Sequence, residues 1–155
     1  MSTHDGFHPD LTQRGTTPLR TRVHHVKAGE LDANTAQSGG MTRLAAISGA
    51  RVGSAAIWMG ETHVAACSAS DNHHHGRSET AIYVVSGHPA FVFHDGTNEV
   101  RLLTGPGDYV FVPPFVPHRE ENPGPDDPAV VVISRSTQEA IVVNLPELYP
   151  LEESP

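Results

Sequence analysis

The spacing of apolar residues along the chain predicts a series of short β-strands. From about residue 44, brief runs rich in Val, Ile, Phe and Tyr alternate with clusters of Gly, Pro and Asp. Each run has the length of a strand and consists largely of β-branched or aromatic residues, which favour extended backbone. The predicted strands are Ile82–Val85, Ala90–Phe93, Val100–Leu103, Tyr109–Val112, Val130–Ser134 and Ile141–Leu145.

Turn-forming residues separate these runs, and Asp95 with Gly96 predicts a hairpin between two of them. No window has a sustained helical period, and 13 prolines and 14 glycines oppose long helices. The chain therefore predicts an all-β sandwich or closed barrel with a single core. We expect an N-terminal extension at 1–43 that ends in a polar loop at 33–43, a barrel at 44–145 and a C-terminal tail at 146–155.

Charge and hydropathy exclude several classes of partner. The 155 residues carry a net charge of −8 and contain no basic stripe, which opposes binding to nucleic acid or to an anionic membrane surface. No apolar run has the length of a membrane span, and the first residues have no signal-peptide pattern. The one cysteine, Cys67, fits a reducing compartment and is expected to be a small buried hydrophobe. These features predict a cytoplasmic protein.

Histidine is the unusual component, with 11 in the chain, and its placement suggests a metal site. The segment from Asn72 to Glu79 reads NHHHGRSE and comes just before a predicted strand. Residues two apart on an extended chain share a face, so His73 and His75 can both point inward. Glu79 reaches the same cavity if the chain bends at Gly76. A second segment delivers His118 after a proline-rich turn, and three imidazoles with one carboxylate suit a first-row divalent ion.

These residues resemble the two motifs of the cupin superfamily. The first motif, with its His-x-His pair, matches at His73, His75, Glu79 and Gly87, and the second matches at Gly107, Pro113, His118 and Asn122. The resemblance covers roughly residues 44–145. It implies a double-stranded β-helix, also called a jelly-roll barrel, with one divalent metal ion inside (iron, nickel, manganese, copper or zinc) and commonly a homodimer.

Three positions depart from the motifs. Cys67 stands where the first motif has its leading glycine, and Phe115 stands where the second has the glycine of Pro-x-Gly. Glu79 is displaced by one residue, and Thr80 occupies the usual carboxylate position. A one-residue slip in a strand reverses the face of a side chain. Either a bulge turns Glu79 inward as a ligand, or the site has three histidines and Glu79 is a base or a surface residue.

The resemblance leaves several functions open. The first hypothesis is a metal-dependent enzyme, an oxidoreductase of the dioxygenase type, acting on a small oxygen-bearing organic molecule, with Glu79 as a possible base. The alternatives are a non-oxidative isomerase, cyclase or lyase, and a non-catalytic module that binds a small molecule. Arg119 and Glu120, beside His118, could line the pocket mouth, although residues of this kind are more often ordinary rim charges. The large aromatic residues are expected in the core or the pocket wall, and they are Trp58, Tyr83, Phe91, Phe93 and Phe111.

Overall fold

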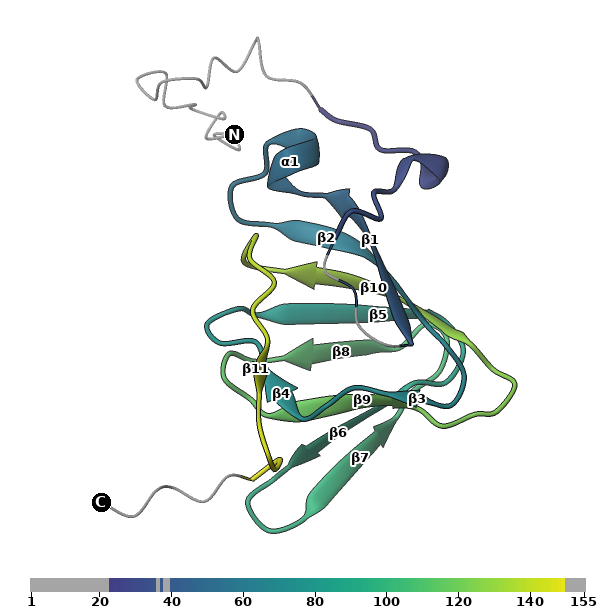
Figure 1. Ribbon diagram of the computed structural model, residues 1–155, viewed down its shortest axis with the longest axis vertical. Helices are drawn as coiled ribbons and strands as arrows, with labels where there is room; N and C mark the ends of the chain where they lie inside the picture. The colour runs from purple at the N-terminus through teal and green to yellow at the C-terminus, as the bar shows by residue number, and fades with distance from the viewer. Residues whose placement is uncertain (1–22, 36, 38–39, 150–155) are drawn as a thin grey trace, which may run out of the picture.

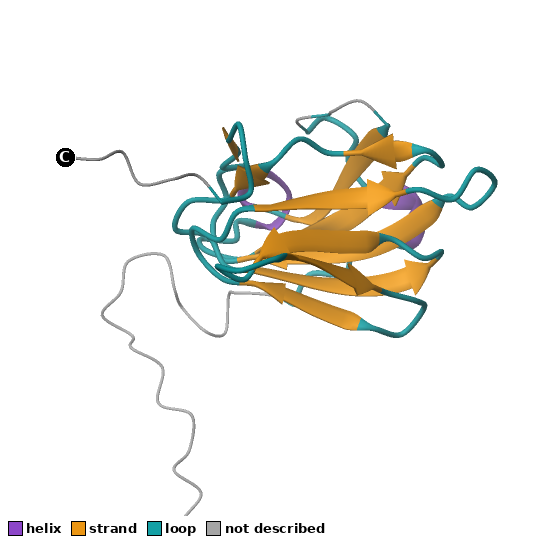
Figure 2. Ribbon diagram, turned by 90° about the horizontal axis from the view of Figure 1, so that it is seen from below, coloured by secondary structure: helices purple, strands orange, loops and turns teal. Residues whose placement is uncertain are grey.

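Two antiparallel sheets face each other and form the body of the protein (Figures 1 and 2). The computed structural model describes residues 23–35, 37 and 40–149; the ends of the predicted extension and tail, 1–22 and 150–155, lie outside them. The first sheet runs in the order β1 (Met41–Ile47), β2 (Trp58–Val64), β10 (Ala129–Arg135), β5 (Thr80–Ser86) and β8 (Tyr109–Val112). The second runs β11 (Val143–Asn144), β4 (His73–His74), β9 (His118–Asn122), β6 (Ala90–His94) and β7 (Glu99–Leu103), with β3 (Ser68–Ala69) paired to β9.

This architecture confirms the predicted all-β, double-stranded β-helix fold. The described helices are short, a 3-10 turn at Ala28–Glu30 and α1 at Gly49–Val52. The predicted hairpin also forms, because β6 and β7 pair on either side of Asp95 and Gly96. No helix among the described residues is long and apolar enough to cross a membrane.

The observed strands differ from the predicted ones at several positions. Five of the six predicted runs lie in β5, β6, β7, β8 and β10, whereas Ile141–Leu145 contributes only the two residues of β11. The sequence did not reveal β9, whose residues read HREEN, because they carry no apolar pattern. The expected loop at 33–43 was wrong at its end, since β1 already begins at Met41.

The hydrophobic core fills one end of the space between the sheets. Ile82, Val84, Phe91, Val112 and Val131 form its central cluster. Full burial of such side chains stabilises the fold by roughly 1.5–3 kcal/mol each. The inward-facing residues of β5 and β10 continue beyond this core, and at the opposite end they are Thr80 and Arg135. The fold therefore has a dry apolar end and a polar end.

The outward faces of β5 and β8 carry apolar residues that were expected inside. Tyr83 and Phe111 are both exposed, and the ring of Tyr83 lies 4.9 Å from that of Tyr109. The expectation of a core or pocket position holds for Phe91 and Trp58 and is wrong for Tyr83 and Phe111. The period of two along each strand decides this, because Ile82 and Val84 occupy the inward positions of β5.

Asn122, the last residue of the second motif, ties two connections together. It is 1% exposed, and its side-chain nitrogen donates to the carbonyl oxygens of Val64 (3.4 Å), Ala65 (3.3 Å) and Asp127 (2.8 Å). Those carbonyls belong to the end of β2 and to the turn before β10. This buried amide therefore fixes where β2 ends and where β10 begins.

The two non-glycine residues at glycine positions of the motifs retain a glycine-type backbone. Cys67 has φ of 56° and Phe115 has φ of 62°, both in the left-handed region. Cys67 is also exposed, so the expectation of a buried cysteine was wrong. The turn geometry thus persists without glycine, at a conformational cost for each side chain.

Replacing Cys67 with glycine is expected to stabilise the protein. Removing the side chain from a residue with a left-handed backbone stabilises the folded state by roughly 1–2 kcal/mol. The added freedom of glycine in the unfolded chain offsets roughly 0.5–1 kcal/mol of this gain. Cys67→Gly should therefore raise the free energy of unfolding by up to about 1 kcal/mol in urea denaturation. Cys67→Ala keeps the Cβ atom and is the control; equal stability of the two variants would contradict the strain.

Candidate metal centre

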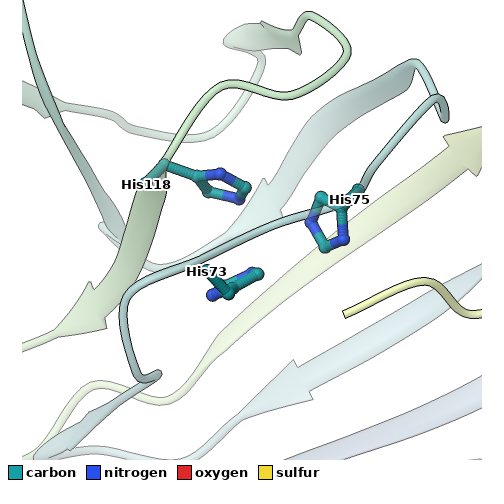
Figure 3. Close-up of side chains that lie close together, drawn as sticks. All are labelled: His73, His75 and His118. Atoms are coloured by element: carbon teal, nitrogen blue, oxygen red, sulfur yellow. The ribbon is translucent and has the colours of Figure 1, made fainter. Parts of the chain in front are cut away.

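Three histidines from two neighbouring strands converge at the polar end of the barrel (Figure 3). His73 opens β4 and pairs directly with His118, which opens β9, while His75 follows β4 by one residue. Their candidate ligand atoms all lie within 4.8 Å of one another. The ring centroids are 4.5 Å apart for His73 and His118, 4.8 Å for His73 and His75, and 5.0 Å for His75 and His118. The structure thus brings together three of the four predicted ligands.

Backbone carbonyls determine which nitrogen of each imidazole is available. The Nδ1 atoms of His73, His75 and His118 lie 2.7, 2.9 and 3.0 Å from the carbonyl oxygens of Asp71, Ile141 and Val116. A carbonyl oxygen only accepts hydrogen bonds, so each Nδ1 carries the hydrogen and each neutral ring keeps a lone pair on Nε2. The second nitrogen of a metal-binding histidine is commonly held in this way.

The Nε2 atom of His118 provides a direct test of whether a metal fits. His118 is 3% exposed, and its Nε2 has no hydrogen-bond partner within the described part of the chain. A buried acceptor without a partner is unfavourable by about 1–3 kcal/mol. A divalent ion at the centre of the three rings would satisfy this atom, and neutral imidazole is a ligand that such ions accept. The residues present therefore fit a metal ion.

Burial keeps two of these imidazoles neutral. Desolvation lowers the pKa of His75 to about 4, against a smaller opposing effect of its hydrogen bond to Ile141. Desolvation also lowers the pKa of His118 to about 4, with a further contribution from His73. Neutral rings at pH 7 bind a metal without first losing a proton.

Glu79, the fourth predicted ligand, does not join the three histidines. Its side chain is exposed, and its backbone nitrogen donates to Ser136 Oγ at 3.0 Å. The adjacent Thr80 is 5% exposed and lines the cavity in the usual carboxylate position. Thr80 pairs in register with Arg135 and Val112, so no bulge at this point turns Glu79 inward.

A cavity of about 580 Å³ adjoins the histidines, with walls from both sheets. The C-terminal segment completes it, because Ala140, Ile141, Val142 and Asn144 lie on its lining. This segment is held by the bond from His75 to Ile141 and by a 2.8 Å bond from Leu145 N to the carbonyl of Asn72. The metal-type site is thus one wall of a space large enough for a small organic molecule.

Glu120 is an acidic residue that the structure places on the lining of the cavity. It follows His118 by two positions on β9, lines the cavity, and its charge acts on His75. Arg119 points to the other face, where it pairs with Glu99 and Glu121. Of the two residues considered for the pocket mouth, Glu120 lines the cavity and Arg119 does not. The period of two counted from His118 would have placed Glu120 inside, had β9 been recognised.

The fold and the three converging imidazoles together define a double-stranded β-helix protein with a metal-type site. Residues 60–134 match the family model described as Cupin domain, which identifies this part of the chain as a cupin domain. No curated protein sequence matches the chain significantly.

Solved structures show the same fold. Oxalate decarboxylase of Bacillus subtilis, which has Mn(II) centres, is 22% identical with a TM-score of 0.60, and the match covers 70% of this chain but 29% of the enzyme. The polyketide cyclase RemF of Streptomyces resistomycificus is 24% identical with a TM-score of 0.60, over 80% of this chain and 84% of the cyclase. A Klebsiella pneumoniae protein with a double-stranded β-helix domain is 16% identical with a TM-score of 0.58, over 74% and 92%.

The lowered pKa values predict acid sensitivity of the metal-free protein. Both rings have lower pKa values in the folded chain, about 4, than the ordinary 6.5, so the unfolded chain binds more protons between these values. Stability should therefore be highest above pH 6.5 and fall as the pH decreases to about 4. Urea denaturation of the metal-free protein across this range measures the slope, which should be smaller in His118→Gln. An unchanged slope would contradict the burial of a neutral ring.

Proposed function

We propose that this cupin is a metal-dependent enzyme that acts on a small oxygen-bearing organic molecule. The observation that carries the proposal is the set of three Nε2 lone pairs, oriented by backbone carbonyls, two of them on histidines that line a cavity of about 580 Å³. His73, His75 and His118 would hold one divalent ion. Three ligands leave coordination positions for water or substrate, which a purely structural site does not need.

The residues around the centre divide the remaining tasks. A bound divalent ion would supply Lewis acidity, and electron transfer if the ion is redox-active. Glu120 is the group placed to accept or donate a proton inside the cavity, the role first considered for Glu79. The C-terminal segment and Trp58 limit the access of water on one side.

Two classes of reaction fit this arrangement. A dioxygenase is the first, because three imidazole ligands suit iron, nickel, copper or manganese as well as zinc. A non-oxidative isomerase, cyclase or lyase is the second, and the specific observation in its favour is the internal carboxylate of Glu120. Decarboxylation and cyclisation are the activities named for two proteins of the same fold, but identities of 22% and 24% support the fold alone.

Metal content separates these possibilities. We expect about one divalent ion per chain in protein purified without a metal-binding tag, measured by mass spectrometry. His118→Ala should lose the ion, whereas Glu79→Gln should retain it, because that side chain is exposed. Iron, nickel, copper or manganese would favour oxygen chemistry, and zinc would favour the non-oxidative class or a binding module.

Glu120→Gln provides the control inside the cavity. It preserves size and removes the charge, so the variant should keep its metal if Glu120 acts on protons and is not a ligand. Absence of any stoichiometric metal from the wild type, even after reconstitution with each of these ions, would sink the proposal.

We further propose that the partner is a second copy of the chain. The outward faces of β5 and β8 provide a continuous apolar surface of Tyr83, Val85, Tyr109 and Phe111. Such surfaces on a protein favour association.

The single, exposed Cys67 supports a cytoplasmic location, where thiols stay reduced.

Phe111→Glu should convert a dimer to a monomer, because it places a charge at the centre of the apolar surface. Light scattering coupled to size exclusion measures the mass. Leu103→Glu, at an exposed apolar residue of the other sheet, is the matched control and should leave the dimer intact. A wild-type protein that is monomeric at high micromolar concentration would contradict the dimer.

A further inference from the structure

The wall of the cavity that belongs to the first sheet carries two arginines. Arg43 lies on β1 and Arg135 on β10, and both line the same cavity as His73 and His75. Neither position follows from the motifs that brought the histidines together. A cavity with a cationic side and an imidazole side binds ligands by charge as well as by shape.

Arg135 is a half-buried cation held by neutral groups. Its Nε donates to the carbonyl of Thr137 at 3.1 Å and its Nη2 to the carbonyl of Gln138 at 2.9 Å. None of the described ion pairs includes Arg135. Burial, together with the charge of Arg43, lowers the pKa of Arg135. A guanidinium in these surroundings gains from an anion that enters the cavity.

Thr62 supplies an independent sign of a missing ligand. It pairs across the sheet with Arg43, is 1% exposed and lines the same cavity. Its hydroxyl Oγ1 is buried and has no hydrogen-bond partner in the part of the chain that the structure describes. Buried hydroxyls are rarely left unpaired, because the lost hydrogen bond is costly. In register Thr62 faces Val131, four residues from Arg135 on β10, so a bound molecule would meet this hydroxyl at a different point from the guanidinium.

Trp58 gives the cationic side a flat apolar surface. The guanidinium carbon of Arg135 lies 4.1 Å from the centre of the Trp58 ring, which helps to fix the orientation of the arginine. Glu120 lines the cavity as well, where its charge acts on His75. An anionic group is therefore favoured near Arg135 and disfavoured near Glu120. The cavity is polarised and orients a molecule with one charged end.

We propose that the cavity binds a small organic carboxylate, with the carboxylate group held by Arg135. The planar guanidinium matches the geometry of a carboxylate, and the body of the molecule lies against Trp58. Resting on the proposed function, the other end of the ligand faces the histidine centre and Glu120. The substrate class of the enzyme is then a carboxylic acid whose reacting end is distant from the recognised group.

Calorimetric titration of the metal-free protein with benzoate and with benzamide tests the recognition. The two molecules share their shape and differ in charge. Benzoate should bind at least about tenfold more tightly than benzamide, as expected for hydrogen bonds to a charged group. Equal binding would overturn the proposal. Inorganic phosphate is the third probe, and phosphate binding as tight as that of benzoate would overturn the assignment to a carboxylate.

Three variants assign the contact. Arg135→Gln should lose about tenfold or more in benzoate affinity, and Arg135→Lys, which keeps the charge but not the planar guanidinium, should lose roughly threefold. Arg77→Gln removes an exposed arginine outside the cavity and should bind as the wild type does. A loss in Arg77→Gln equal to that in Arg135→Gln would indicate general electrostatics and overturn the proposal. If Arg135→Gln does not fold, an unchanged affinity in Arg135→Lys overturns it.

This experiment is separate from the test of the metal. Benzoate binding is measured without metal, and His118→Ala should retain it, because His118 is not part of the arginine wall. If the protein binds no metal but still prefers benzoate to benzamide, the proposed metal-dependent enzyme is contradicted and the carboxylate site is supported. Stoichiometric metal without selectivity would sink the carboxylate site alone.

Discussion

Three hydrogen bonds to backbone carbonyls control the chemistry of this barrel. An imidazole has two nitrogens, and the acceptors at Asp71, Ile141 and Val116 hold the hydrogen of each ring on Nδ1. Each Nε2 lone pair is consequently available at the centre of the cluster. Two of the carbonyls lie two residues before the histidine they serve, so they come with the local turn. The third, at Ile141, comes from the C-terminal segment, 66 residues further along the chain.

The dependence on Ile141 connects the site to the whole fold. The segment that carries this carbonyl also closes the cavity and pairs as β11 with β4. Displacing it would release the orientation of His75 and open the cavity together. The metal-type site and the access of ligands are therefore not independent properties, because one short stretch of backbone serves both.

The barrel accommodates polar groups by separating them from its core. Ile82, Val84 and Val131 fill one end, and the cavity with its two arginines, Glu120 and the histidines occupies the other. Buried polar groups without partners oppose folding. A packed apolar end allows the barrel to hold an unpaired hydroxyl at Thr62 and an unpaired nitrogen at His118. Such groups are expected where a protein is shaped for a ligand rather than for stability alone.

The sequence by itself determined the all-β fold, about half of the strands, and the convergence of His73, His75 and His118. The spacing of apolar residues, the turn residues and the motif spacing are local signals in the sequence. The resemblance to cupins connected the two histidine segments into one site. The tertiary structure decided what depends on neighbours far along the chain. It placed Thr80 inside and Glu79 outside, because the register of β5 against β8 and β10 selects the face. It also brought Glu120, Thr62 and Arg135 into one cavity, since these residues lie on strands that meet only when the sheets close.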